Sequence, residues 1–187
     1  YGVISGGRHG ITTDLGATLV NYGQITGRNG SGFGSDGDGT VINHGTITGA
    51  YSGLQANGDG DGVDIDNIAH IENYGTIQGV GAGGVDKGGF ANGSEGIALG
   101  GGYILNGKNA LISGADSAIL VDDGSGNSGL AATTLENFGT IQGLNGFGVK
   151  IVGEFDDNVV NGGTISGSNG LALDLGGGND SLTLRNG

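Results

Sequence analysis

The residues most able to do chemistry lie in one acidic stretch, 57–66, which reads Asn-Gly-Asp-Gly-Asp-Gly-Val-Asp-Ile-Asp. Its first six residues alternate oxygen-bearing side chains with glycine, a pattern typical of the opening of a calcium-binding loop. Asp59, Asp61 and Asp64 would supply carboxylate oxygens, which Ca²⁺ prefers as ligands. The glutamate that closes such a loop is missing, because Ile68 holds the twelfth position. The stretch therefore predicts either a Ca²⁺ site at Asp59, Asp61 and Asp64 or an acidic loop without a ligand, and no other cofactor is expected.

The remaining candidates for catalysis have simpler explanations. The three histidines, His9, His44 and His70, have no partners at metal-ligand spacing, and neither Gly-x-Ser-x-Gly nor His-Glu-x-x-His occurs. The acidic pairs 122–123 and 156–157 are adjacent in sequence, so on a strand their side chains would point to opposite faces. These residues do not indicate an enzyme.

A seven-residue phrase, Asn-aromatic-Gly-x-Ile-x-Gly, organises the chain. Full copies lie at 21–27, 43–49, 73–79 and 137–143, the copy at 161–167 has Gly in the aromatic position, and shortened copies lie at 1–6 and 109–114. The phrase isoleucines are 21, 22, 30, 35, 29 and 24 residues apart, in the order Ile4, Ile25, Ile47, Ile77, Ile112, Ile141 and Ile165. Recurrence at this period indicates a repeat protein whose connections vary in length.

Two further apolar runs accompany each phrase. Alternating runs lie at 10–15, 62–65, 96–99, 118–121, 148–151 and 170–173, and an apolar pair precedes the next Asn. Alternation with period two indicates strands, so each repeat contains three short strands. One coil per repeat tolerates uneven connections, whereas a β-propeller needs more constant blades. The prediction is an all-β, right-handed parallel β-helix of about seven three-stranded rungs, forming a single segment over 1–187.

The repeated positions also predict what lies inside and outside the coils. Ile, Leu and Val should form the core, and the Asn residues should form a ladder of amide hydrogen bonds, the alternative being solvated turn residues. The ladder members are Asn21, Asn43, Asn73, Asn137 and Asn161, and the stacked rings beside them are Tyr22, His44, Tyr74 and Phe138. Loops are expected at 28–39, 57–67, 80–94, 122–133 and 153–158. Exposed anchors for a partner would be Tyr51, Phe33, Phe90 and Phe147.

The composition limits the classes of partner. The 187 residues carry a formal net charge of −13, from 19 acidic against 6 basic residues. Nucleic acid is therefore not an expected partner, because phosphate binding needs clustered Lys and Arg. Cysteine is absent, so no disulfide is formed, and no run of 18 apolar residues is present.

The recurring Asn-Tyr-Gly-Thr-Ile-x-Gly phrase, the Gly-Ile-x-Leu strands and the ending at 173–184 resemble the passenger domains of bacterial autotransporters, the type V secreted proteins. The resemblance implies a β-helical segment of a longer passenger. It also implies an extracellular place at the bacterial cell surface, reached through an outer-membrane β-barrel of the same polypeptide outside this segment.

The same resemblance sets the functional expectation. Such passengers act as adhesins or as aggregation and biofilm factors, or as the stalk that displays them, and their partners are host cell surfaces, matrix or neighbouring bacterial cells. The chain is expected not to be an enzyme. The alternative is a carbohydrate-active β-helix resembling polysaccharide lyases or hydrolases, in which acidic and basic residues would converge on one cleft.

Overall fold

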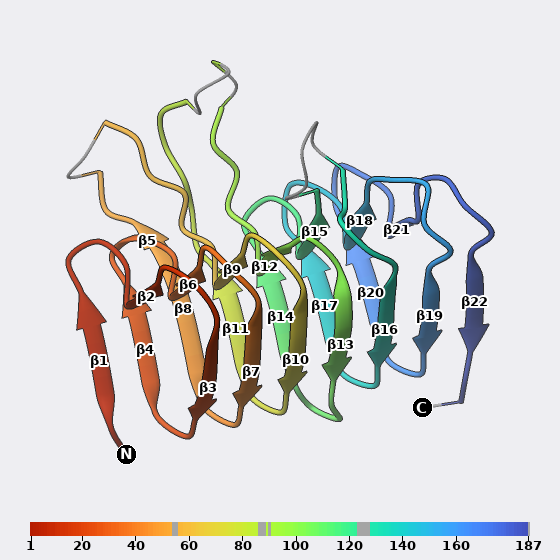
Figure 1. The fold of residues 1–187 in the computed structure, drawn as a ribbon, viewed down its shortest axis with the longest axis horizontal. Helices are drawn as coiled ribbons and strands as arrows, with labels where there is room; N and C mark the ends of the chain where they lie inside the picture. The colour runs from red at the N-terminus through yellow and green to blue at the C-terminus, as the bar shows by residue number, and fades with distance from the viewer. Residues whose placement is uncertain (54–55, 86–88, 90, 123–127, 187) are drawn as a thin grey trace.

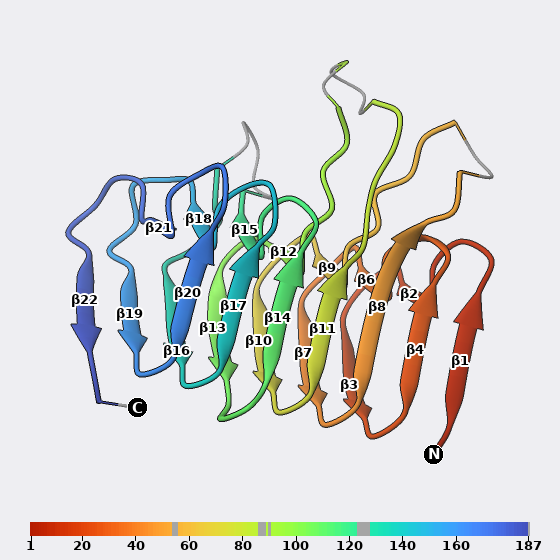
Figure 2. The same ribbon diagram turned by 180° about the vertical axis from the view of Figure 1, so that it is seen from behind.

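The computed structural model describes residues 1–53, 56–85, 89, 91–122 and 128–186. The chain winds into a parallel β-helix with seven coils and three sheets, here called A, B and C, and no helix occurs in these residues. The chain rises along sheet A, crosses over at sheet B, descends along sheet C and advances toward the C-terminus (Figures 1 and 2). This path makes the coil right-handed, the usual hand of parallel crossovers. The predicted fold is confirmed.

Sheet A contains the Ile-x-Gly end of each phrase. Its parallel strands are β1 (Val3–Gly6), β4 (Gln24–Gly27), β8 (Thr46–Tyr51), β11 (Thr76–Gly79), β14 (Leu111–Gly114), β17 (Thr140–Gly143) and β20 (Thr164–Gly167). The short β5 (Asn29–Gly30) pairs antiparallel with β8. Like residues pair across the coils, so Ile77 lies between Ile47 and Ile112.

Sheet B contains the alternating runs. Its strands are β2 (Ile11–Thr13), β6 (Phe33–Ser35), β9 (Val63–Ile65), β12 (Ile97–Leu99), β15 (Ile119–Val121), β18 (Val149–Ile151) and β21 (Leu173–Asp174). Five of these seven strands lie within the predicted runs, and β21 overlaps the run at 170–173 by one residue. The seventh, β6, lies within 28–39, so the prediction of a loop there is wrong. Its Phe33 is 1% exposed and belongs to the core, and it therefore cannot be an exposed anchor.

Sheet C contains the apolar pairs that lead into each Asn. Its strands are β3 (Ala17–Asn21), β7 (Gly39–Asn43), β10 (Ala69–Asn73), β13 (Gly102–Asn106), β16 (Thr133–Asn137), β19 (Asn158–Asn161) and β22 (Ser181–Leu184). Strand residues at 63–65, 133 and 158 lie inside three of the predicted loops, so the loops at 57–67, 122–133 and 153–158 are shorter than predicted. Within 80–94 the described residues form no named strand. In the part of the chain that is described, no helix is long and apolar enough to cross a membrane.

The core is a continuous column of aliphatic side chains. Ile47, Ile77, Ile112 and Ile141 are each 0% exposed, and residues from sheets B and C pack against them. Each such side chain stabilises the fold by roughly 1.5–3 kcal/mol when fully buried. The column is therefore extended by every coil.

The last glycine of each phrase turns the chain from sheet A toward sheet B. A Cβ at Gly143 would lie 2.0 Å from the carbonyl oxygen of Phe147, and one at Gly79 would lie 2.1 Å from that of Glu95. Because both obstacles are backbone atoms, no side-chain movement relieves the clash. The phrase ends in glycine for this steric reason.

We expect Gly143→Ala to lower the free energy of unfolding by about 2 kcal/mol, because the added methyl group forces the corner backbone to move. Chemical denaturation followed by circular dichroism measures the change. Gly7→Ala is the matched control, since a Cβ there meets nothing within 4 Å. Equal effects of the two substitutions would contradict the steric role of Gly143.

The Asn ladder is confirmed for its five predicted members, and the structure adds a sixth. Each Nδ2 donates to the Oδ1 of the next Asn at 2.8–2.9 Å, in the order Asn21, Asn43, Asn73, Asn106, Asn137 and Asn161. Asn106, the last residue of β13, is the added member. Asn109, the first residue of the shortened copy, takes a left-handed turn, with φ of 64°.

The ring stack is confirmed for three members. Tyr22 and His44 have centroids 4.7 Å apart, and His44 and Tyr74 are 4.9 Å apart, in nearly parallel planes. Gly107 lies over the far side of Tyr74. No stacked pair joins Phe138 to this group in the described residues.

The other expected anchors are partly packed. Tyr51 is half-buried in β8, where the backbone of Gly83 approaches its ring, and Phe147 is half-buried beneath Lys150 Nζ, 5.2 Å from the ring centroid. Phe90 lies outside the described residues.

Candidate functional site: an acidic corner and an aromatic face

The predicted calcium residues lie at the corner between sheets A and B. Asp61 precedes β9, and Glu95 holds the same place before β12 in the next coil. The backbone N–H of Glu95 donates to Asp61 Oδ1 at 2.7 Å, and the two side chains are only 4% and 7% exposed. Asp61 is therefore turned toward Glu95. Sequence reasoning missed Glu95, and its position ahead of a Gly-apolar run is the signal that could have found it.

Asp64 and Asp59 lie outside this buried pair. Asp64 is in the middle of β9 between the buried Val63 and Ile65, so it points outward, and Ser31 Oγ donates to its Oδ2 at 3.3 Å. Asp59 is exposed. Within the described ranges, no three His, Cys, Asp or Glu side chains are grouped so that they could hold a metal ion.

Burial and repulsion between carboxylates raise the pKa values of the acidic groups at this corner. Burial raises the pKa of Glu95 to about 7, with Asp116, Asp122 and Asp59 adding repulsion and Asp61 opposing the shift through a hydrogen bond. The pKa of Asp61 is raised well above its ordinary range by burial and then by Glu95 and Asp64. Burial and then Asp66 raise the pKa of Asp64 to about 7.

We expect the chain to lose stability as the pH rises. Glu95 and Asp64 have folded-state pKa values of about 7, above their unfolded values of about 4, so their stabilising contribution is complete below pH 4 and is lost as the pH passes through about 7. The raised pKa of Asp61 acts in the same direction. Glu95→Gln should remove a change on the order of 2 kcal/mol between pH 5 and pH 8. Melting temperatures at the two pH values test this, with the exposed Glu154→Gln as control. A Glu95→Gln variant as pH-dependent as the parent would contradict it.

The calcium site stays a prediction. We expect titration calorimetry near pH 8 to detect binding at about 1 mM Ca²⁺, an affinity common in extracellular modules. The double substitution of Asp59 and Asp64 by Asn should abolish the heat of Ca²⁺ binding, whereas Asp14→Asn should leave it unchanged. Absence of heat from the parent chain at this concentration would exclude the site.

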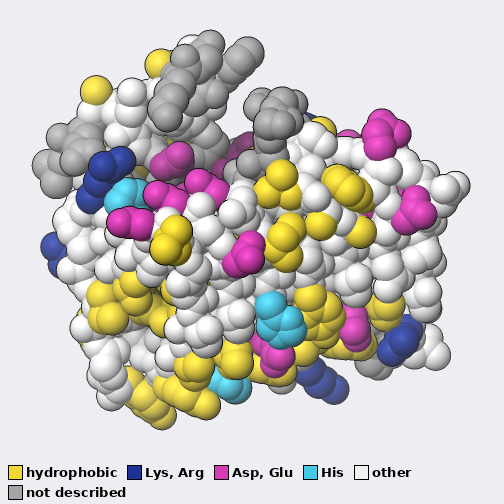
Figure 3. Space-filling model, in the orientation of Figure 1, with side chains coloured by type: hydrophobic (Ala, Val, Ile, Leu, Met, Phe, Trp, Pro, Cys, Tyr) yellow, Lys and Arg dark blue, Asp and Glu magenta, His cyan; other side chains and the backbone are white. Residues whose placement is uncertain are grey.

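A second candidate is the outer face of sheet C, where aromatic and acidic side chains gather. Alternation along the strands and parallel pairing place Thr18, Thr40, His70 and Tyr103 in one outward row. A second row contains Val20, Ile42, Glu72, Leu105 and Glu136. Figure 3 looks onto this face and shows histidine, acidic and hydrophobic side chains close together near its middle.

Contacts hold these groups in place. The rings of His70 and Tyr103 stack with centroids 5.0 Å apart. Glu72 accepts from His70 Nε2 at 3.1 Å and from the Tyr74 hydroxyl at 2.8 Å, and these hydrogen bonds lower the pKa of Glu72. The Tyr103 hydroxyl donates to Glu136 at 3.4 Å. The result is an ordered, exposed array of rings and carboxylates.

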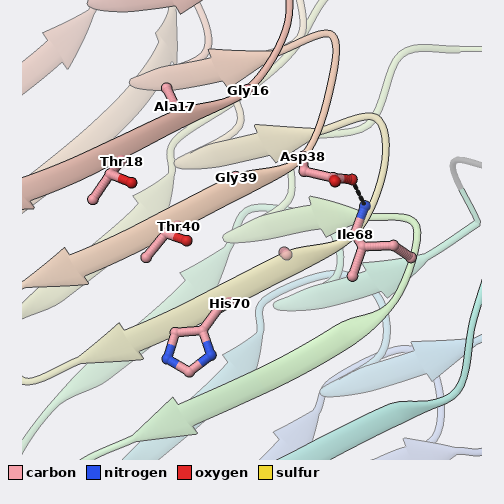
Figure 4. A pocket seen from close by; sticks show the side chains of 9 residues that line it. Gly16, Ala17, Thr18, Asp38, Gly39, Thr40, Ile68 and His70 are labelled. Atoms are coloured by element: carbon pink, nitrogen blue, oxygen red, sulfur yellow. Dashed lines mark hydrogen bonds between the residues drawn. The ribbon is translucent and has the colours of Figure 1, made fainter.

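A shallow hollow of about 360 Å³ lies beside this array (Figure 4). It spans β3, β7 and β10, and small residues at the strand starts, Ala17, Gly39 and Ala69, form it. Thr18, Thr40 and His70 stand at its side, and Asp38 Oδ1 accepts from the Ile68 N–H at 3.1 Å. Sequence reasoning did not single out any of these residues except His70, because only the register brings them together.

Comparison with protein-family models, with curated proteins and with solved structures found no match to this chain. Its function is therefore inferred from the geometry of its own residues.

Sheet A differs from sheet C in its outward side chains. Its two outward rows consist of Thr, Ser and Gln with Val3 and Leu111, and none of them is charged. Aromatic rings are also absent from these rows. Sheet A therefore offers matched positions for control substitutions.

Proposed function

We propose that this chain is a surface-exposed, adhesin-like β-helical segment that binds its partner through the outer face of sheet C. The observation that carries the proposal is the ordered set of His70, Glu72 and Tyr103 on the face of sheet C, with Tyr74 in the turn directly after β10, all held by stacking and hydrogen bonds. Aromatic side chains supply much of the energy at binding surfaces, and prior ordering lowers the entropy cost of association.

The proposal includes the setting that the autotransporter resemblance implies. The segment belongs to a longer passenger displayed outside a bacterial cell, where its partners are host cell surfaces, matrix or neighbouring cells. It works without catalysis. Asp61 and Glu95, whose pKa values are raised, support this reading because both are buried and neither lines the hollow on sheet C.

Adhesion of coated beads tests the proposal. Beads carrying the chain are scored for binding to epithelial cells, to matrix proteins and to each other. We expect binding to one of these surfaces, and we expect the pair Tyr74→Ala and Tyr103→Ala to weaken it about tenfold. The matched control is Thr76→Ala with Thr140→Ala on sheet A. Absence of binding by the parent chain would overturn the proposal in favour of a passive stalk.

A further inference from the structure

We propose that the hollow on sheet C, lined by Thr18, Thr40, Asp38 and His70, is a binding site for an uncharged pyranose residue of a glycan. This inference rests on the proposed function and names the ligand class that the sheet C face recognises. The hollow, the position of the His70 ring at its border and the surrounding charge each support it.

The hollow has the size and lining that a sugar ring requires. Its volume of about 360 Å³ falls at the lower end of the range for small-ligand sites. Ile68, which is 37% exposed, provides apolar surface for the C–H groups of a pyranose, and the inward-pointing Ala17 and Ala69 leave the floor of the hollow to the backbone. The Thr18 and Thr40 hydroxyls each donate and accept hydrogen bonds, which matches the hydroxyl groups of sugars.

His70 is prepared to act as a stacking platform. Tyr103, in the following coil, covers one face of the imidazole at 5.0 Å, and Glu72 accepts from Nε2. Thr40 pairs with His70 in the preceding coil, so the other face of the ring is directed toward the hollow. Figure 4 shows the ring standing at this border. Because Thr40 is shorter than His70, a pyranose lying over Thr40 would contact the outer part of the imidazole without displacing either neighbour.

The charge around the hollow selects against acidic sugars. Asp38 lines the hollow, and Glu72 accepts a hydrogen bond from His70 at its border. None of the residues that line the hollow is Lys or Arg. Carboxylates accept hydrogen bonds from sugar hydroxyls but repel uronates and sialic acids. An uncharged hexose or N-acetylhexosamine is therefore the class that fits.

The threonines also indicate how a polymer would lie. Thr18 and Thr40 are paired in neighbouring strands, so their hydroxyls repeat along the axis at roughly 4.8 Å. A glycan that enters the hollow can continue along the row of outward side chains. Longer chains should bind more tightly than single sugars.

The test measures retention of the 187-residue chain on immobilised neutral polysaccharides, namely β-glucan, mannan, galactan and chitin, with pectate and hyaluronan as anionic comparators. Titration with the soluble hexasaccharide of the retained polymer then gives affinities. We expect His70→Ala to weaken binding about tenfold and Thr40→Val about fivefold. His70→Tyr, which keeps an aromatic platform, should retain binding within about threefold.

The matched control is Thr46→Val, which removes an outward hydroxyl from sheet A. Binding to a neutral glycan that His70→Ala and Thr40→Val weaken, and Thr46→Val does not, supports the site. No retention on any neutral polysaccharide, a preference for the anionic ones, or equal affinities of the variants overturns it. If beads still adhere to cells through Tyr74 and Tyr103 in that case, the proposed function stands and only the glycan is excluded.

Discussion

Replacing Ile77 by Asp is expected to unfold the chain. Ile77 is 0% exposed and lies between Ile47 and Ile112, so a carboxylate there would be buried without a partner inside the column. Such burial costs more than about 4 kcal/mol, a large part of the stability of a typical domain. Circular dichroism and solubility should show loss of the cooperative thermal transition.

The neighbouring residue provides the control. Thr76 lies on the same strand but points outward, and Thr76→Asp should keep the transition within a few degrees of the parent. A soluble Ile77→Asp protein with an unchanged melting temperature would show that this side chain does not face the core.

Interrupting the Asn ladder is expected to have the next largest effect. Asn73 Nδ2 donates to Asn106 Oδ1, to Leu111 O and to Gly75 O, and its Oδ1 accepts from Asn43 Nδ2. Asn73→Ala leaves several of these buried groups without partners, and each costs about 1–3 kcal/mol. We expect a loss of roughly 3–4 kcal/mol in the free energy of unfolding, measured by urea denaturation.

Two other asparagines calibrate this result. Asn161, the last member of the ladder, accepts from Asn137, but its partner in the next coil is Leu184, which has no side-chain amide, so Asn161→Ala should cost less than Asn73→Ala. The exposed Asn169→Ala should change little. If Asn73→Ala and Asn169→Ala had equal stabilities, the amide ladder would not contribute to the fold.

The fold was predictable from sequence because the repeated phrase fixes one strand and one corner of every coil. The period-two pattern predicted the strands of sheet B wherever two apolar residues alternate with other residues. The pattern did not predict the strand in Gly32-Phe33-Gly34-Ser35, because Phe33 is the sole large apolar residue there and glycine lies on both sides of it. The sixth ladder member, Asn106, also needed the structure, because the shortened copy begins only at 109 and the register of β13 is what pairs Asn106 with Asn73 and Asn137.

The sites were less predictable for a related reason. Thr18, Thr40, His70 and Tyr103 are 22 to 33 residues apart in successive pairs, and the uneven connections hide their common row. Asp61 and Glu95 are 34 residues apart for the same reason. Residues that come together only because coils stack on one another form no local sequence motif. The composition therefore suggested an acidic loop around Asp61 but not its buried partner Glu95.

The stacking of coils determines how the molecule would respond to a pull along its axis. Neighbouring coils are joined by backbone bonds in three sheets and by an Asn amide at one edge, and all these bonds lie along the direction of the force. Tension on a tethered end therefore acts first on the end coil, which has a partner on one side only, while interior coils keep partners on both sides. Under the drag of flowing liquid, such a rod would fail by losing coils one at a time from its ends, and the middle would keep its shape.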